Sequence, residues 1–236
     1  MAALLAAWEW AGRSKASFAI PTFTQTALAG VDLLGSRPFW EALGTSGQSL
    51  AMGMAGAVAV GIPLGLLMGT LPTLGRYLRV YFELMIAIPT AAVIPLVILT
   101  MGITVRSSAL IVFLFSAPFI TMNAYAGVRD VNPRLAEMAR AFAATPRQFF
   151  VKIVVPSSLP MLLVGLRYGL SRAFVGLVVA ELLLSPFGVG KLIMNASSMF
   201  QYDRLFAAVG LTIMAALALL AALQRLEGRL LHWRRP

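Results

Sequence analysis

Four long stretches without a charged residue limit the fold of this chain more than any other feature of its sequence. They are residues 42–75, 84–105, 107–128 and 205–224. A further apolar stretch, residues 158–184, is interrupted by only three charges, Arg167, Arg172 and Glu181. Because about 20 consecutive apolar residues cross a bilayer as a helix, we predict an all-α fold, a polytopic transmembrane helical bundle with five full spans.

Composition and charge agree with an integral membrane protein. Charged residues make up 12% of the 236 residues, against about 25% in soluble domains. The absence of cysteine excludes disulfides and thiolate metal sites. The net charge of +10 could suggest nucleic acid, but the basic residues lie in short loops and in the C-terminal tail. Membrane topology therefore explains the charge better.

The N-terminal segment MAALLAAWEW is apolar but too short to cross a bilayer alone, and Glu9 falls inside it. It lacks the basic region that begins a secretory signal peptide. We expect it to be the outer end of a shortened first span. The alternative is an interfacial helix anchored by Trp8 and Trp10.

Lys and Arg counts predict the orientation, since cytoplasmic loops carry an excess of both. If the segment 132–156 is cytoplasmic, eleven basic residues lie on that side and six on the other. We therefore predict that this segment and the C-terminus both face the cytoplasm.

The segment 132–156 has the start and stop signals of two short helices. Asn132-Pro133 is typical of a helix start, with Asn as the N-cap and Pro in the first helical position. An apolar stripe with helical spacing follows, formed by Leu135, Met138 and Phe142. From local pattern alone this stripe could equally pack on its own bundle.

A second helix is predicted just afterwards. Thr145 and Gln148 are spaced as a capping box around Pro146. Pro156 and Pro160 are expected to break the chain as it re-enters the membrane.

The same segment carries a spacing that resembles the EAA loop of ABC importer permeases, E-A-A-x3-G-x9-I-x-L-P. The residues at the defined positions of this pattern are Glu137, Met138, Ala139, Ala143, Ile153, Val155 and Pro156. Met138, Ala143 and Val155 depart from the pattern, although each remains apolar. The resemblance runs from about residue 44 to 231 and includes IPTAAVIPLVILTMGI, VGLRYGLSRAFVGLVVAELL and GVGKLI. These stretches look most like permeases of the nitrate, sulfonate and taurine importer group.

This resemblance implies a type I ABC importer permease fold in a bacterial cytoplasmic (inner) membrane. It makes residues 1–236 one permease domain whose segment 132–156 holds a coupling helix for a separate ATPase. ATP and Mg²⁺ would bind to two ATPase subunits and not to this chain, which has no Walker A loop. A second permease copy and a solute-binding protein are the other implied partners. The implied ATPase-coupling residues are Leu135, Glu137, Met138, Ala139, Arg140, Phe142, Ala143, Ile153 and Pro156.

The span that follows the coupling helix carries a stripe of small residues, which permits close helix approach in lipid. By resemblance it lies near the two-fold axis of a permease dimer and lines the pathway; ordinary packing within one bundle is the alternative. The dimer and pathway residues are Gly165, Gly169, Arg172, Ala173, Gly176, Ala180 and Glu181. Arg167 is expected to extend toward the cytoplasmic interface, and Glu181 has no obvious partner.

An enzyme is disfavoured, because the single histidine, His232, lies in the basic tail and cannot build a triad or a His/Cys metal site. The expected function is inward transport of a small solute, nitrate-like or sulfonate-like, by alternating access. An ion-coupled secondary transporter is the alternative, although no internal repeat is visible. A membrane scaffold would leave the EAA spacing unexplained.

Overall fold

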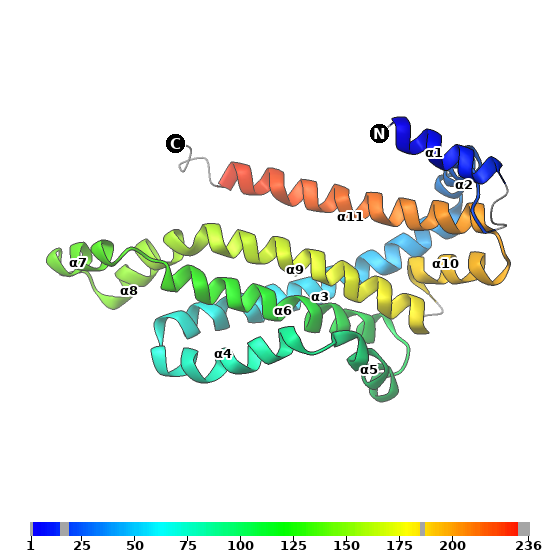
Figure 1. Cartoon of the computed structure of the whole chain (residues 1–236). Helices are drawn as coiled ribbons and strands as arrows, with labels where there is room; N and C mark the ends of the chain where they lie inside the picture. Colours follow the sequence, from blue (N-terminus) through cyan, green and yellow to red (C-terminus); the bar gives the residue numbers. More distant parts are fainter. Residues whose placement is uncertain (1, 15–18, 185–186, 231–236) are drawn as a thin grey trace.

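The computed structural model describes residues 2–14, 19–184 and 187–230, and every regular element within these ranges is helical. Four helices are long and apolar enough to cross a membrane. They are α3 (Arg37–Thr70), α6 (Val105–Arg129), α9 (Val155–Leu184) and α11 (Tyr202–Leu230). In Figure 1, α9 runs opposite to the other three. The predicted all-α class is therefore confirmed, with four helices that are candidates for spanning a membrane.

Helix α6 is the centre of the bundle, and α3 lies against it along a stripe of small residues. The stripe repeats every four residues and consists of Gly53, Ala57, Gly61, Gly65 and Gly69. A Cβ added at Gly53 would lie 2.4 Å from the Ala109 carbonyl oxygen of α6. One at Gly65 would lie equally close, 2.4 Å, to the carbonyl oxygen of Thr121. The two backbones therefore touch, as small residues permit in lipid.

Helix α9 packs on the same α6 with the stripe expected at a dimer interface. Gly165, Gly169, Ala173, Gly176 and Ala180 are all buried within this one chain. A Cβ at Gly165 would meet the Asn123 side chain at 2.7 Å, and one at Gly176 would meet the Phe115 ring at 2.6 Å. The expectation that these five residues face a second copy or the pathway was wrong, because α6 already covers them.

The expected span at residues 84–105 is divided in two. Helix α4 (Pro72–Ala87) ends before Pro89, a 3₁₀ turn, η1 (Thr90–Val93), follows, and α5 (Ile94–Met101) continues. Ile88 has an extended backbone, with ψ of 136°, because the ring of the next residue, a proline, disfavours the helical conformation. Neither α4 nor α5 is among the four helices long enough to span, so five continuous spans are not found in the described residues.

Two helices of 12 residues each, α1 (Ala2–Arg13) and α2 (Phe23–Leu34), form the N-terminal part. A helix of this length covers about 18 Å, less than the roughly 30 Å of a hydrocarbon core. The expected first span is therefore not a continuous helix. Instead α2 contacts α11, and Trp8 of α1 lies against Phe23 and Phe206.

The two ends of the bundle carry different short helices. At one end, α7 (Pro133–Ala141) and α8 (Pro146–Phe149) project beyond the long helices, on the side where α11 ends (Figure 1). At the other end lie α1, α2 and α10 (Gly188–Ser198). The segment 132–156 and the end of α11 thus share one side, as the predicted topology requires. Which side faces the cytoplasm stays a prediction.

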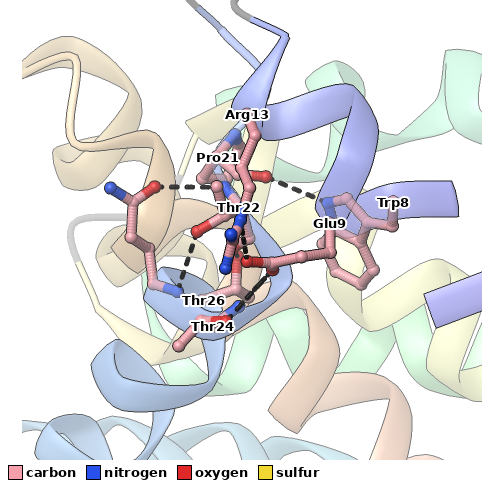
Figure 2. A network of polar contacts seen from close by, with 8 residues as sticks. Trp8, Glu9, Arg13, Pro21, Thr22, Thr24 and Thr26 are labelled. Atoms are coloured by element: carbon pink, nitrogen blue, oxygen red, sulfur yellow. Dashed lines mark hydrogen bonds and ion pairs between the residues drawn. The ribbon is translucent and has the colours of Figure 1, made fainter. Parts of the chain in front are cut away.

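A polar network fixes α1 to the start of α2 (Figure 2). The Glu9 carboxylate accepts hydrogen bonds from the backbone N–H and the hydroxyl of Thr24, both 3.1 Å long, and it pairs with Arg13. The indole N–H of Trp8 donates to the carbonyl oxygen of Pro21. The Thr24 backbone N–H, which favours the ionised carboxylate, is the main reason that the pKa of Glu9 is lowered.

We predict that replacing Gly169 by Leu destabilises the folded chain by about 1–3 kcal/mol through overpacking. The physical reason is that a Cβ there lies 2.7 Å from the Ile120 side chain. Thermal unfolding of the detergent-solubilised protein measures the effect. Gly210→Leu is the matched control, since its Cβ meets nothing within 4 Å. If Gly169→Leu unfolds at the wild-type temperature but no longer self-associates, the small-residue stripe of α9 belongs to an interface between copies instead.

We also predict that docking of α1 is sensitive to acid. Because folding lowers the pKa of Glu9 below its ordinary 4.5, the stabilisation is present above that pH and is lost as the pH falls through the folded pKa. The measurement is Trp8 fluorescence after Trp10, Trp40 and Trp233 have been replaced by Phe. Adding Glu9→Gln should remove this transition, and an unchanged acid profile in that variant would contradict the assignment.

Candidate functional site

The caps predicted for α7 and α8 are present. The Asn132 side chain accepts a hydrogen bond from the backbone N–H of Arg134, and Pro133 opens α7. Thr145 and Gln148 form the complete capping box, each side chain accepting from the other residue's backbone N–H. The helix pair is therefore determined by its local sequence.

The turn between α7 and α8 explains the small residue at position 143. Ala143 has a φ of +49°, in the left-handed region that favours glycine. The Ala144 N–H donates to the carbonyl oxygen of Ala139, and the Ala143 N–H donates to that of Arg140. These two bonds form a Schellman motif. A larger or branched side chain at position 143 would add to the strain of this backbone.

The apolar stripe of α7 is split between the bundle and the surface. Phe142 is 81% exposed and Met138 is 45% exposed. Glu137 and Arg140 are exposed beside them, whereas Leu135 is half-buried and Ala139 is buried. Ala139 therefore supports the turn within its own chain and is not available for close contact with a partner. The outward surface of α7, formed by Glu137, Met138, Arg140 and Phe142, is called the α7 face below.

The expected break at Pro156 and Pro160 is wrong, since α9 runs through both residues. The irregularity lies just before them, in a π-helical turn, η2 (Phe150–Val154). A proline ring clashes with the carbonyl group four residues earlier in an α-helix. In the wider π-turn the Val155 N–H donates to the carbonyl oxygen of Phe150, five residues earlier, and α9 follows directly. Ile153 is half-buried in this turn.

Arg167 is paired, and does not extend alone toward the interface. Its guanidinium donates to the Glu227 carboxylate of α11, which is 7% exposed. Sequence reasoning missed Glu227 because it lies beyond the uncharged stretch 205–224, while α11 continues to Leu230. The signal that could have revealed the pair was the presence of opposite charges, Arg167 and Glu227, on two spanning helices.

Glu181 also has partners, contrary to expectation. Its carboxylate accepts from the Ser46 hydroxyl of α3 at 2.6 Å and from the backbone N–H of Gly190 at 3.0 Å. The residue is 1% exposed. Gly188 has a φ of +77°, and a Cβ there would lie 2.4 Å from the Glu181 carboxylate. Glu181 therefore fastens the start of α10 to the bundle.

Arg172 is the one charge of the predicted pathway set that remains exposed. Its guanidinium carbon lies 5.0 Å from the centre of the Phe119 ring, a cation–π contact. Both side chains line a cavity of about 380 Å³ at the break between α4 and α5. The other walls of the cavity include Met85, Ile88, Pro89, Val175 and Val179.

Comparison with known proteins gives a consistent result. Residues 61–231 match the family model described as "Binding-protein-dependent transport system inner membrane component". The taurine transport system permease protein TauC of Escherichia coli is 31% identical over 82% of this chain and 70% of its own. The putative aliphatic sulfonates transport permease protein SsuC of Bacillus subtilis is 32% identical over 99% of this chain and 85% of its own.

A third relative and a solved structure extend the comparison. The formylaminopyrimidine transport permease protein ThiX of Halalkalibacterium halodurans is 30% identical over 98% of this chain and 93% of its own. An inward-facing structure of the MetNI methionine ABC transporter has a TM-score of 0.69 at 19% identity. That alignment covers 83% of this chain and 99% of the MetNI chain, and it shows a shared fold.

We predict that Glu227→Gln destabilises the bundle because it leaves Arg167 without its counter-charge. The decrease in the free energy of unfolding should stay below the ~3–5 kcal/mol that removal of one partner from a fully buried ion pair costs, since the Arg167 side chain is 42% exposed. Thermal unfolding in detergent measures it. The exchanged pair Arg167→Glu with Glu227→Arg should recover part of the loss. Additive effects of the two single exchanges would show that the pair contributes no coupling energy.

Proposed function

The chain belongs to the family of binding-protein-dependent transport system inner membrane components, and on that premise we propose that it is the transmembrane permease subunit of an ATP-binding-cassette importer. The observation that carries the proposal is the α7 face. Met138 and Phe142 are exposed at the projecting end of the bundle, beside the charged Glu137 and Arg140. Apolar side chains ringed by charges are suited to a protein partner.

In this proposal the α7 face docks on a separate ATPase. Phe142 and Met138 enter an apolar groove, and Glu137 and Arg140 fix the register with charge-assisted hydrogen bonds. Ala139 and Ala143 hold the turn that presents this face, while Ile153 and Pro156 join it to α9. ATP and Mg²⁺ bind to the ATPase, and this chain contributes no catalytic residue.

The working complex contains two permease copies, two ATPase subunits and a solute-binding protein at the opposite side. Helices α4 and α5 together cross the membrane as one broken span, since both contact α6. The side of the bundle that holds α7 and the end of α11 faces the cytoplasm. The opposite side, with α1, α2 and α10, faces outward. The excess of Lys and Arg at the α7 end supports this orientation.

Transport proceeds by alternating access. ATP binding closes the ATPase pair and draws the two α7 faces together; hydrolysis releases them. Because α8, η2 and α9 form one nearly continuous helical path, displacement of α7 is transmitted to the span that carries Arg172. Each nucleotide state favours a different access state of the permease.

The proposed solute is a small, nitrate-like or sulfonate-like molecule. The relatives TauC and SsuC, named for taurine and aliphatic sulfonates, support this class. An ion-coupled secondary transporter is the rival function. It would need carboxylates free to bind ions inside the spans, whereas Glu181 and Glu227 are engaged within the chain.

We predict that Arg140→Cys reacts with a thiol reagent from the cytoplasmic side only and is shielded when the ATPase is bound. The chain has no native cysteine, so the background is clean. Ser197→Cys, at the opposite end in α10, is the matched control and should react from outside with or without the ATPase. Labelling is measured in right-side-out and inverted vesicles.

A secondary carrier can reproduce the sidedness of both cysteines, but it gives no ATPase-dependent shielding. Equal labelling of Arg140→Cys in complexes with and without the ATPase would reject the docking assignment. Reversed sidedness of the two positions would reject the orientation.

A further inference from the structure

Arg172 carries a charge deep within a spanning helix. It lies 12 residues, about 18 Å, from the end of α9 at Leu184. Among the residues that the structure describes, Arg172 forms no ion pair. Its contact within the chain is with the face of the Phe119 ring, which attracts a cation but does not neutralise it.

Three carboxylates, on α4, α9 and α11, have other partners in this arrangement. Glu83 of α4 pairs with Arg79 at 2.6 Å. Glu181 binds Ser46 and the start of α10, and Glu227 pairs with Arg167. Arg167 and Glu181, the other charges within α9, thus have charged or hydrogen-bonding partners inside the chain, whereas Arg172 forms no ion pair within the described residues.

A charge within the membrane is expensive and normally faces a cavity or a partner. Arg172 does face a cavity, and its volume of about 380 Å³ lies within the range of small-molecule sites. The cavity is lined by Ile88 and Pro89, where the backbone leaves the helical conformation at the end of α4. Irregular backbone at membrane depth is tolerated where it lines a cavity.

The guanidinium also restricts the chemistry of an occupant. It presents a planar set of N–H donors that matches two oxygens of one oxyanion. The Phe119 contact holds the group in place, so less side-chain freedom is lost when an anion binds. The remaining walls are mainly apolar and can contact a short organic chain.

We propose that Arg172, held by Phe119 at the α4–α5 break, binds the oxyanion group of the transported solute during passage and thereby selects for anions. This inference rests on the proposed permease function and adds to it a specificity-determining residue. The same oxyanion chemistry occurs in phospholipid headgroups, so the experiment separates a passing solute from a bound lipid.

The test uses the complete complex with its ATPase and binding protein in proteoliposomes. ATP-dependent uptake is measured for anionic ethanesulfonate and nitrate, zwitterionic taurine and cationic choline. Arg172→Gln should lower uptake of the accepted anion about tenfold or more, and Arg172→Lys should lower it less. Arg225→Gln, which removes a charge near the inner end of α11, is the control and should transport like the wild type.

Chemical restoration of the charge separates recognition from folding. Arg172→Cys should lose uptake, and aminoethyl methanethiosulfonate should restore part of it. The thiolate attacks the reagent's sulfur, forms a disulfide that carries an ammonium group and releases methanesulfinate. The sulfonatoethyl reagent, of similar size but negative, should restore nothing. Equal rescue by both reagents, or no loss in Arg172→Gln, overturns the proposal.

The remaining outcomes distinguish the two proposals. A wild-type complex that takes up only choline in an ATP-dependent way overturns the role of Arg172 and leaves the permease function intact. A wild-type complex without ATP-driven uptake of any solute rejects the permease function itself. Unchanged anion uptake in Arg172→Gln, together with loss of copurified anionic lipid, assigns the cavity to a lipid headgroup.

Discussion

The close approach of α3 and α9 to α6 is the contact on which the rest of the structure depends. Lipid tails are as apolar as the helix surfaces, so burial of apolar area does not drive the spans together. Close backbone packing provides dispersion contacts instead, and two stripes of small residues allow it on both sides of α6. Once these three helices are fixed, the positions of α4, α10 and α11 follow from contacts with them.

The charges inside the spans separate structural positions from functional ones. Two contacts each join a pair of helices: the ion pair of Arg167 with Glu227 and the hydrogen bond of Glu181 with Ser46. Both provide charged groups with partners that lipid tails cannot offer. Arg172 forms no ion pair within the described residues; it lies over the Phe119 ring of α6 and faces the cavity at the broken span. The same residue type on one helix thus has two different roles, and only the neighbours on α6 and α11 distinguish them.

The two ends of the molecule differ in how they are built. At the α7 end, capping residues and the turn at Ala143 form a compact unit that projects from the bundle and presents Phe142. At the opposite end, α1 and α10 are fastened by carboxylates that accept from backbone N–H groups, Glu9 for Thr24 and Glu181 for Gly190. The α7 end therefore projects from the bundle, whereas α10 at the opposite end is tied to it.

The sequence by itself determined the helical membrane class, four of the five expected spans, the start of α7 and the capping box of α8, because these depend on hydrophobic length and on bonds between residues at most four apart. Tertiary structure alone decided the rest. It assigned the Gly165 to Ala180 stripe to α6 and gave Arg167 and Glu181 their partners. It also placed the strain before Pro156 in a π-turn. The physical reason is that a one-dimensional pattern specifies which face of a helix is small or charged, whereas the helix that covers that face is selected by the packing of the whole bundle.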